Sequence, residues 1–215
     1  NAVPFLIHHL SQQDVGEAIV KALIQIGVPA LPHLRRALSD GNPLAVSRAA
    51  IALGRLKDME SVPQLIVLLK HPDHMVRRSA ISVLGFIGHP DAIPHLIQLL
   101  WDEDSVIRSD ATNALATIGP PAQEALIQIA DAEKWEVREA VMIALRGTRD
   151  SHAVPTVIRR LSSDENEQVR AAAAYTLGEI GSDGAAVDAL RNALADVSAT
   201  VRFTAVESLG RLTAV

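Results

Sequence analysis

The chain has 215 residues, of which 48% are hydrophobic, 21% are charged and 3% are aromatic, and its formal net charge is −5. This composition indicates a folded protein, because disordered chains combine low hydrophobicity with high net charge. The absence of cysteine excludes disulfides, thiolate zinc sites and a cysteine nucleophile. The apolar runs are far shorter than the roughly 20 residues that span a bilayer, and the acidic balance disfavours nucleic-acid binding. We therefore expect a cytoplasmic protein that binds neither membranes nor nucleic acids.

One leucine recurs along the whole chain at a nearly constant spacing. Its neighbouring copies are 30, 31, 31, 30, 32 and 32 residues apart. The copies are Leu23, Leu53, Leu84, Leu115, Leu145, Leu177 and Leu209. A small or apolar residue lies four positions before each leucine, and an apolar residue usually lies three positions after it. Because these offsets mark one face of an α-helix, each leucine is predicted to lie on the buried face of a helix, here named helix B.

A second helical pattern, here named helix A, precedes helix B. It begins with an apolar residue and a proline, which the first helical turn tolerates because the missing N–H has no partner there. The clearest predicted starts are Val3-Pro4, Val62-Pro63, Ile93-Pro94 and Val154-Pro155. Glycines four residues after a recurring leucine are predicted to end helix B as left-handed caps. These glycines are Gly27, Gly88, Gly119 and Gly181.

In chain order, these signals predict seven repeats of one helix A and one helix B. The expected repeats are 1–27, 28–57, 58–88, 89–119, 120–149, 150–181 and 182–215. A pair of short helices cannot bury its own apolar face, so neighbouring pairs are expected to stack into a continuous core. The sequence thus predicts a single all-α domain over residues 1–215, an armadillo-like α-solenoid with helices A on one side and helices B on the other.

The residues from Asp73 to Gly88 follow the pattern Asp-x-x-Val-Arg-x-x-Ala-x-x-x-Leu-Gly-x-Ile-Gly, and much of it recurs from Val169 to Gly181. This pattern resembles the short HEAT-like repeat of the phycobilisome-lyase type, and the resemblance covers nearly the whole chain. It implies an α-solenoid, in a superfamily of bilin lyases, phycobilisome-degradation factors, scaffold proteins and designed repeat binders. The first two repeats carry Gly16 and Val46 in place of the arginine. Such irregularity indicates a natural sequence and not a consensus design.

An arginine column runs through helix B of the last five repeats, with acidic residues just before it. The column contains Arg77, Arg108, Arg138, Arg170 and Arg202. The acidic residues are Asp73, Asp102, Asp104, Asp164 and Asp196. Because acid and base recur together in one repeat frame, we interpret the column as structural. The acids are expected to cap helix B or to pair with an arginine of the same or a neighbouring repeat.

Positions one, five and nine residues after the column vary between repeats and are predicted to share a helix-B face away from the core. The inner helices of a solenoid line a concave surface suited to binding. The candidate protein-binding residues on this face are Arg55, Arg78, Ser82, Phe86, Asn113, Glu139, Ile143, Tyr175, Phe203 and Glu207. Aromatic and arginine side chains carry most of the energy at typical interfaces. The alternative is an ordinary surface, since lone exposed apolar residues are normal.

Two tryptophans complete the candidate site. Trp101 and Trp135 follow helix A in consecutive repeats and are expected to lie near each other along one edge of the solenoid. There they either fill the gap between repeats or contact a partner.

The eight histidines do not form a convincing metal site. His71 and His74 lie on either side of Asp73, but Pro72 distorts the helical spacing and no second cluster is evident. No His-Glu dipeptide occurs, which excludes the di-iron site of helical-repeat hydroxylases. Serine-nucleophile and phosphate-loop motifs are also missing. We therefore predict no catalytic residue, no metal and no cofactor.

The sequence favours a non-catalytic scaffold that binds another protein through helix B. The family resemblance implies an alternative, a bilin lyase or a factor that handles or degrades the phycobiliprotein chromophore. Its partner would be a phycobiliprotein or a second repeat subunit. A start at Asn1 is consistent with a third alternative, a repeat domain of a larger regulatory protein.

Overall fold

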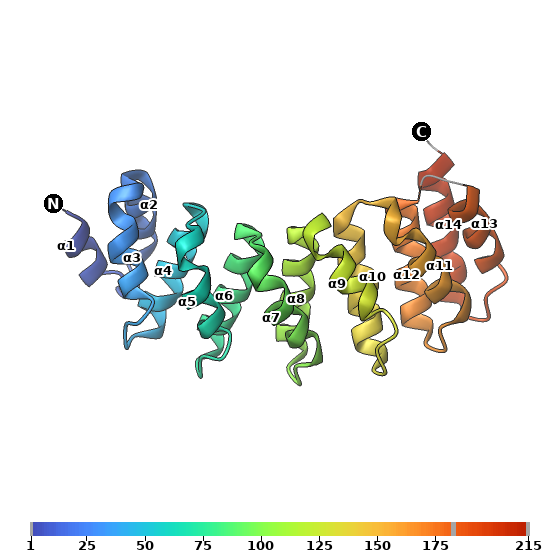
Figure 1. The fold of residues 1–215 in the computed structure, drawn as a ribbon, viewed down its shortest axis with the longest axis horizontal. Helices are drawn as coiled ribbons and strands as arrows, with labels where there is room; N and C mark the ends of the chain where they lie inside the picture. Colours follow the sequence, from blue (N-terminus) through green and yellow to red (C-terminus); the bar gives the residue numbers. More distant parts are fainter. Residues whose placement is uncertain (1, 182–183, 214–215) are drawn as a thin grey trace. The chain divides into compact units, whose positions relative to one another are not determined.

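A computed structural model describes residues 2–181 and 184–213. These residues form fourteen α-helices joined by short turns and 3₁₀ segments, with no strand in the described part (Figure 1). The helices alternate between a shorter helix A and a longer helix B in seven successive pairs. The predicted all-α solenoid of seven helix pairs is thus confirmed.

The helices group into two compact units, Asn1–Leu96 and Ile97–Val215, and α7 (Ile93–Gln98) crosses the boundary between them. In the first unit, the A helices are α1 (Val3–His8), α3 (Leu31–Ala37) and α5 (Val62–Leu68). The B helices of this unit are α2 (Gly16–Ile26), α4 (Pro43–Arg55) and α6 (His74–Ile87). The single domain expected from the sequence remains a prediction.

The second unit continues the same alternation of helices. Its A helices are α9 (Gln123–Gln128), α11 (Val154–Ser163) and α13 (Gly184–Ala193). Its B helices are α8 (Ser105–Ile118), α10 (Trp135–Thr148), α12 (Glu167–Ile180) and α14 (Ala199–Thr213). A 3₁₀ turn, Leu99–Trp101, continues α7 and packs against α8 and α10.

The recurring leucines form the centre of the core in each unit. All of them except Leu209 are fully buried, and Leu209 is half-buried on the last helix. Each fully buried leucine contributes about 1.5–3 kcal/mol to folding through the removal of apolar surface from water. Each B helix packs against the next one in the same unit. In the first unit α4 lies between α2 and α6, and in the second unit α8 packs on α10, α10 on α12, and α12 on α14. This packing fixes one face of every B helix and leaves the opposite face outside the core.

The predicted helix starts are confirmed, because α1, α5, α7 and α11 each begin with the apolar-proline pair. Asparagine and aspartate side chains cap several B helices by accepting backbone N–H groups of the first turn. Asp73, for example, accepts from the N–H groups of Met75 and Val76 at 2.9 and 3.1 Å. Caps of this kind typically stabilise a helix by about 1 kcal/mol.

The four glycine caps do not share one conformation. Gly88 adopts the predicted left-handed form, with φ 75° and ψ 22°. Gly27 and Gly119 also have positive φ, 72° and 73°, but their ψ values of −136° and −132° lie outside the left-handed helical region. The predicted left-handed cap is therefore confirmed only for Gly88 and is wrong for Gly27, Gly119 and Gly181, the last of which is extended at φ −76°. A Cβ there would lie 2.6 Å from the Cβ of Ala186, so glycine is required by close packing.

Candidate functional site

The arginine column ties each helix B to the loop that precedes it. In all five repeats, Nη1 of the arginine donates to the backbone carbonyls six and five residues earlier, at 2.8–3.2 Å. Arg77, for example, donates to the carbonyls of His71 and Pro72. Loop carbonyls that secondary structure leaves unpaired are satisfied in this way. The geometry supports the structural interpretation of the column.

Two column arginines also join neighbouring repeats. Arg138 donates from Nε and Nη2 to the two carboxylate oxygens of Asp164, at 2.8 and 2.9 Å, and Arg170 binds Asp196 in the same way. The side chain of Asp164 is fully buried. Burial by itself raises the pKa of Asp164, but hydrogen bonds from Arg138 and the N–H of Asn166 outweigh it, and the pKa is lowered.

The first repeat lacks the column arginine, and an arginine of the next repeat replaces it. Gly16 occupies the column position, and a Cβ at this residue would lie 1.8 Å from Nη1 of Arg48. In the space that the glycine leaves, Nη1 of Arg48 donates to the carbonyls of Leu10 and Gln12, both at 2.7 Å. The sequence did not predict that Arg48 takes the place of the missing arginine, because Gly16 and Arg48 belong to different repeats.

In the first unit, two grooves described by the structure lie on the helix-B face. The larger groove, of about 730 Å³, lies across α2, α4 and α6. Its lining includes Arg55 and the apolar side chains of Val20, Ile24, Leu44, Ile51 and Met75. The smaller, of about 250 Å³, includes three predicted residues, Arg55, Ser82 and Phe86. Nζ of Lys57 lies 5.7 Å from the centre of the Phe86 ring. Arg78 is exposed on α6 and does not line either groove.

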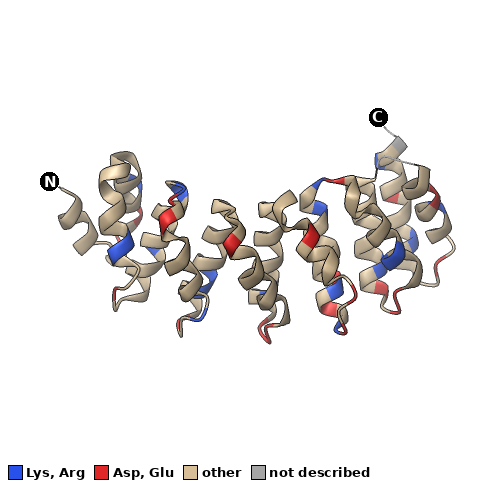
Figure 2. Ribbon diagram, viewed as in Figure 1, with Lys and Arg blue, Asp and Glu red and all other residues tan. Residues whose placement is uncertain are grey.

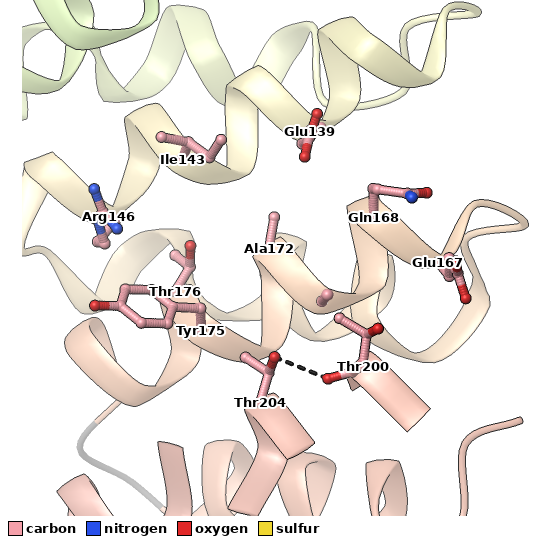
Figure 3. Close-up of a pocket in the computed structure, with 11 residues that line it drawn as sticks. Glu139, Ile143, Arg146, Glu167, Gln168, Ala172, Tyr175, Thr176, Thr200 and Thr204 are labelled. Atoms are coloured by element: carbon pink, nitrogen blue, oxygen red, sulfur yellow. Dashed lines mark hydrogen bonds between the residues drawn. The ribbon is translucent and has the colours of Figure 1, made fainter. Parts of the chain in front are cut away.

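In the second unit, two grooves among the described residues, each of about 350 Å³, also lie on the helix-B face. One lies between α8 and α10 and includes the predicted residues Asn113 and Trp135. The other crosses α10, α12 and α14, and we name it the Tyr175 groove (Figure 3). Its lining residues are Glu139, Ile143, Arg146, Glu167, Gln168, Ala171, Ala172, Tyr175, Thr176, Thr200 and Thr204. The predicted residues Glu139 and Ile143 line both grooves.

The Tyr175 groove has a basic, aromatic end. The guanidinium carbon of Arg146 lies 5.1 Å from the centre of the Tyr175 ring, and that of Arg211 lies 4.3 Å from it. Nε of Arg211 also lies 3.7 Å from Oε1 of Glu179. Cation–π contacts of this kind hold the guanidinium groups close to the ring. Three helices therefore build this end, with α10 and α14 supplying the charges and α12 the ring.

The opposite end of the Tyr175 groove is acidic. Figure 3 shows Glu139, Gln168 and Glu167 at one end of the groove and Arg146 with Tyr175 at the other. Partial burial raises the pKa of Glu139, and the neighbouring charge of Glu136 raises it further. Between the two ends, the hydroxyl of Thr204 donates to the carbonyl of Thr200 at 2.9 Å. The groove thus separates negative from positive charge along its length.

Of the remaining candidates, Phe203, Glu207 and Trp101 do not line any of the grooves described above. Phe203 and Glu207 are exposed on α14 and do not line the Tyr175 groove. Trp101 ends the 3₁₀ turn after α7, whereas Trp135 is the first residue of α10, so the two tryptophans occupy different positions in their repeats. Each is more than one third exposed. Their expected role at an edge of the solenoid remains a prediction.

Acidic and basic residues are interspersed along both units (Figure 2). Among the described residues, no group of three histidine or carboxylate side chains is placed to hold a metal ion.

None of the helices in the described ranges combines the length and the apolar character that a membrane span requires.

The sequence of the chain matches the family of HEAT repeats over residues 36–116 and 123–210. No curated protein is significantly similar to it in sequence.

Solved structures resemble the fold. The archaeal HEAT-like repeats protein from Thermococcus onnurineus NA1 is 14% identical, with a TM-score of 0.68 over 99% of this chain and 97% of that protein. Kap95p, in a structure of its binding to RanGDP, is 16% identical, with a TM-score of 0.67 over 100% of this chain and 35% of Kap95p. A chain of the CpcE–CpcF phycocyanin lyase complex from Nostoc sp. PCC7120 is 23% identical, with a TM-score of 0.48 over 98% and 94%.

Proposed function

We propose that this chain, which belongs to the HEAT-repeat family, is a non-catalytic scaffold that binds another protein through its helix-B face. The observation that carries the proposal is the position of the grooves. All four described above lie on B helices, two in each unit, and predicted residues such as Phe86, Asn113 and Tyr175 line them. Stacked repeats with one free helical face typically use that face for binding.

The chemistry of the grooves suits a protein ligand. Each combines apolar side chains with a few charged ones, as with Ile51 and Arg55 in the first unit or Ile143 and Arg146 in the second. Interfaces between proteins typically have an apolar centre with aromatic and arginine anchors. The Kap95p structure has the same fold and contains a bound protein, RanGDP, so the fold is compatible with such a role.

The arginine column does not provide the binding surface in this proposal. Its Nη1 groups already donate to loop carbonyls in every repeat that carries the arginine. A partner that drew these side chains away would leave the carbonyls without hydrogen bonds, at about 1–3 kcal/mol for each buried group. Residues that differ between repeats are therefore better candidates for contact with a partner.

Site-specific photo-crosslinking tests this proposal. The photoreactive amino acid p-benzoylphenylalanine replaces Phe86 in the first unit or Asn113 in the second, because both residues line helix-B grooves and are exposed. Control variants carry it at Gln64 on α5 or Gln128 on α9, which are exposed on A helices. In extracts of the source organism, we expect one protein to crosslink to the helix-B positions and not to the controls. Equal crosslinking at all four positions, or crosslinking at the A helices alone, would contradict the proposal.

A further inference from the structure

We propose that the Tyr175 groove binds an extended segment of a partner protein that carries a basic and an acidic side chain about three residues apart. This inference rests on the proposed function and specifies the ligand chemistry at one part of the same face. The charge pattern of the groove and the length over which it extends carry the inference.

The basic end of the groove is suited to a carboxylate. The side chain of Arg146 lies over the Tyr175 ring, and its guanidinium makes no hydrogen bond or ion pair with another described residue. A guanidinium held in this way keeps its N–H donors available, and its planar edge matches the two oxygens of a carboxylate. The guanidinium carbon of Arg211 lies 4.3 Å from the centre of the same ring, but Glu179, 3.7 Å from its Nε, partly balances its charge, so the carboxylate is expected to bind Arg146. A carboxylate bound here gains charge-assisted hydrogen bonds without displacing an internal partner.

The acidic end of the groove is suited to a cation. Glu139 is half-buried, and its carboxylate makes no hydrogen bond or ion pair with another described residue. Glu136 lies one turn earlier on α10, and Glu167 lines the groove from the first turn of α12. A partly desolvated carboxylate beside like charges is unfavourable unless a cation pairs with it. A lysine or arginine side chain of a partner would supply that cation.

The spacing of the charges selects an extended ligand. Glu139 and Arg146 are seven residues apart on α10, which places them about 10 Å apart along the helix axis at 1.5 Å per residue. An extended peptide covers this distance in about three residues at 3.3 Å each. The groove of about 350 Å³ is at the small end of ligand sites, which span roughly 300–1,000 Å³. It suits a short strand, because a helix with its side chains is about 10–12 Å across.

The middle of the groove fits this ligand. Ala172 lies on α12 between the two charged ends, and Ile143 lines the groove from α10 (Figure 3). Ala171 is also among the lining residues. These side chains offer apolar contact and no further charge. The residues between the basic and the acidic side chain of the ligand are therefore expected to be small or apolar.

Peptide selection against the purified full chain tests the inference. We expect random octapeptides displayed on phage to be enriched for a lysine or arginine and an aspartate or glutamate that lie three or four residues apart, in one order or the other. The enriched peptide and its charge-reversed version are then synthesised, and binding is measured by fluorescence polarisation. Glu139→Gln and Arg146→Gln are each expected to weaken binding of the enriched peptide about tenfold or more, as lost hydrogen bonds to charged groups do. Control variants Glu124→Gln and Arg36→Gln change exposed charges on A helices and should leave binding unchanged.

A charge reversal in the groove separates recognition from a structural role of the same residues. Selection against Glu139→Lys should enrich an acidic residue in place of the basic one, an effect that a loss of stability cannot produce. Circular dichroism checks that each variant is folded. Failure to enrich any peptide, enrichment without the charge pair, or affinities insensitive to Glu139→Gln and Arg146→Gln would overturn the inference. If crosslinking at Phe86 or Asn113 still succeeds, only this inference fails; if crosslinking fails as well, the proposed function fails with it.

Discussion

The buried pair of Arg138 and Asp164 provides a direct test of whether the arginine column holds repeats together. Arg138 joins the loop before α10 to the loop before α12, through the carbonyls of Ala132 and Glu133 on one side and the carboxylate of Asp164 on the other. The two side chains are 7% and 0% exposed. Arg138→Met keeps much of the apolar length of the side chain and removes the charge with all of these hydrogen bonds.

We expect this substitution to be strongly destabilising. Removing one partner of a buried ion pair costs about 3–5 kcal/mol, because the other charge stays buried without compensation. Asp164 retains Nη1 of Arg160 at 3.2 Å and the N–H of Asn166 at 3.0 Å. The expected loss is therefore at the lower end of that range, about 3 kcal/mol. The exposed pair of Arg159 and Asp131, with side chains 46% and 59% exposed, is the matched control, and Arg159→Met should cost about 0–1 kcal/mol.

Urea denaturation followed by far-UV circular dichroism gives the free energy of unfolding for each variant. A double-mutant cycle with Asp164→Asn isolates the pair, and we expect a coupling energy of about 2 kcal/mol. Because repeats interact mainly with their neighbours, amide hydrogen exchange should show the loss of protection centred on α10 and α12. Equal effects of Arg138→Met and Arg159→Met, or a coupling energy near zero, would refute the structural role assigned to the column.

Four further outcomes are expected. Gly16→Ala should displace Arg48 and leave two carbonyls without its hydrogen bonds, which should lower the free energy of unfolding by about 1–3 kcal/mol in denaturation experiments. Since the pKa of Asp164 is lowered in the folded state, its contribution to stability is complete above the unfolded pKa of about 3.9 and is lost as the pH falls through the folded value. Melting curves should therefore show that Arg138→Met weakens the loss of stability below about pH 4; an unchanged profile would contradict this cause. Because the pKa of Glu139 is raised, its ionised form is unfavourable at neutral pH, and Glu139→Gln should raise the free energy of unfolding by less than about 1 kcal/mol. A fall in the melting temperature would show that the charge stabilises the fold. Finally, a protein-binding scaffold should leave the visible spectrum of added phycocyanobilin unchanged, and a shifted band would instead support the bilin-handling alternative.

The fold was predictable because its signals are local and repeated. The recurring leucines appear at a helical spacing within each repeat, and prolines such as Pro63 mark the first turn wherever they occur. In a solenoid, each repeat packs mainly on its neighbours, so a pattern found in one repeat predicts the packing of the next. The glycine caps were less predictable, because only Gly88 has the left-handed conformation, and at Gly181 glycine is instead required by close packing against Ala186.

The candidate site was predictable only in part. Tyr175, Glu139 and Ile143 lie on the face that the repeat frame indicated, and the structure places all three in one groove. Arg146 was not among the predicted residues, because it lies eight positions after the column and not at one, five or nine. Its place beside Tyr175 depends on how α10 packs against α12. That packing involves two neighbouring repeats, so the sequence pattern of a single repeat does not predict it.

Arginines on the B helices therefore divide by what already occupies their donors. Arg77 and the other column arginines bind carbonyls at fixed offsets in their own loops, and Arg48 binds two loop carbonyls of the first repeat, where Gly16 replaces the column arginine. Arg146 has no such partner among the described residues, although it is the same residue type on the same kind of helix. The Nη1 group of a column arginine must break internal hydrogen bonds before it can bind a ligand, whereas the side chain of Arg146 can offer all of its N–H donors. Binding of a partner is thus favoured at residues that differ between repeats, such as Arg146, whereas the residues that the repeats share stabilise the fold.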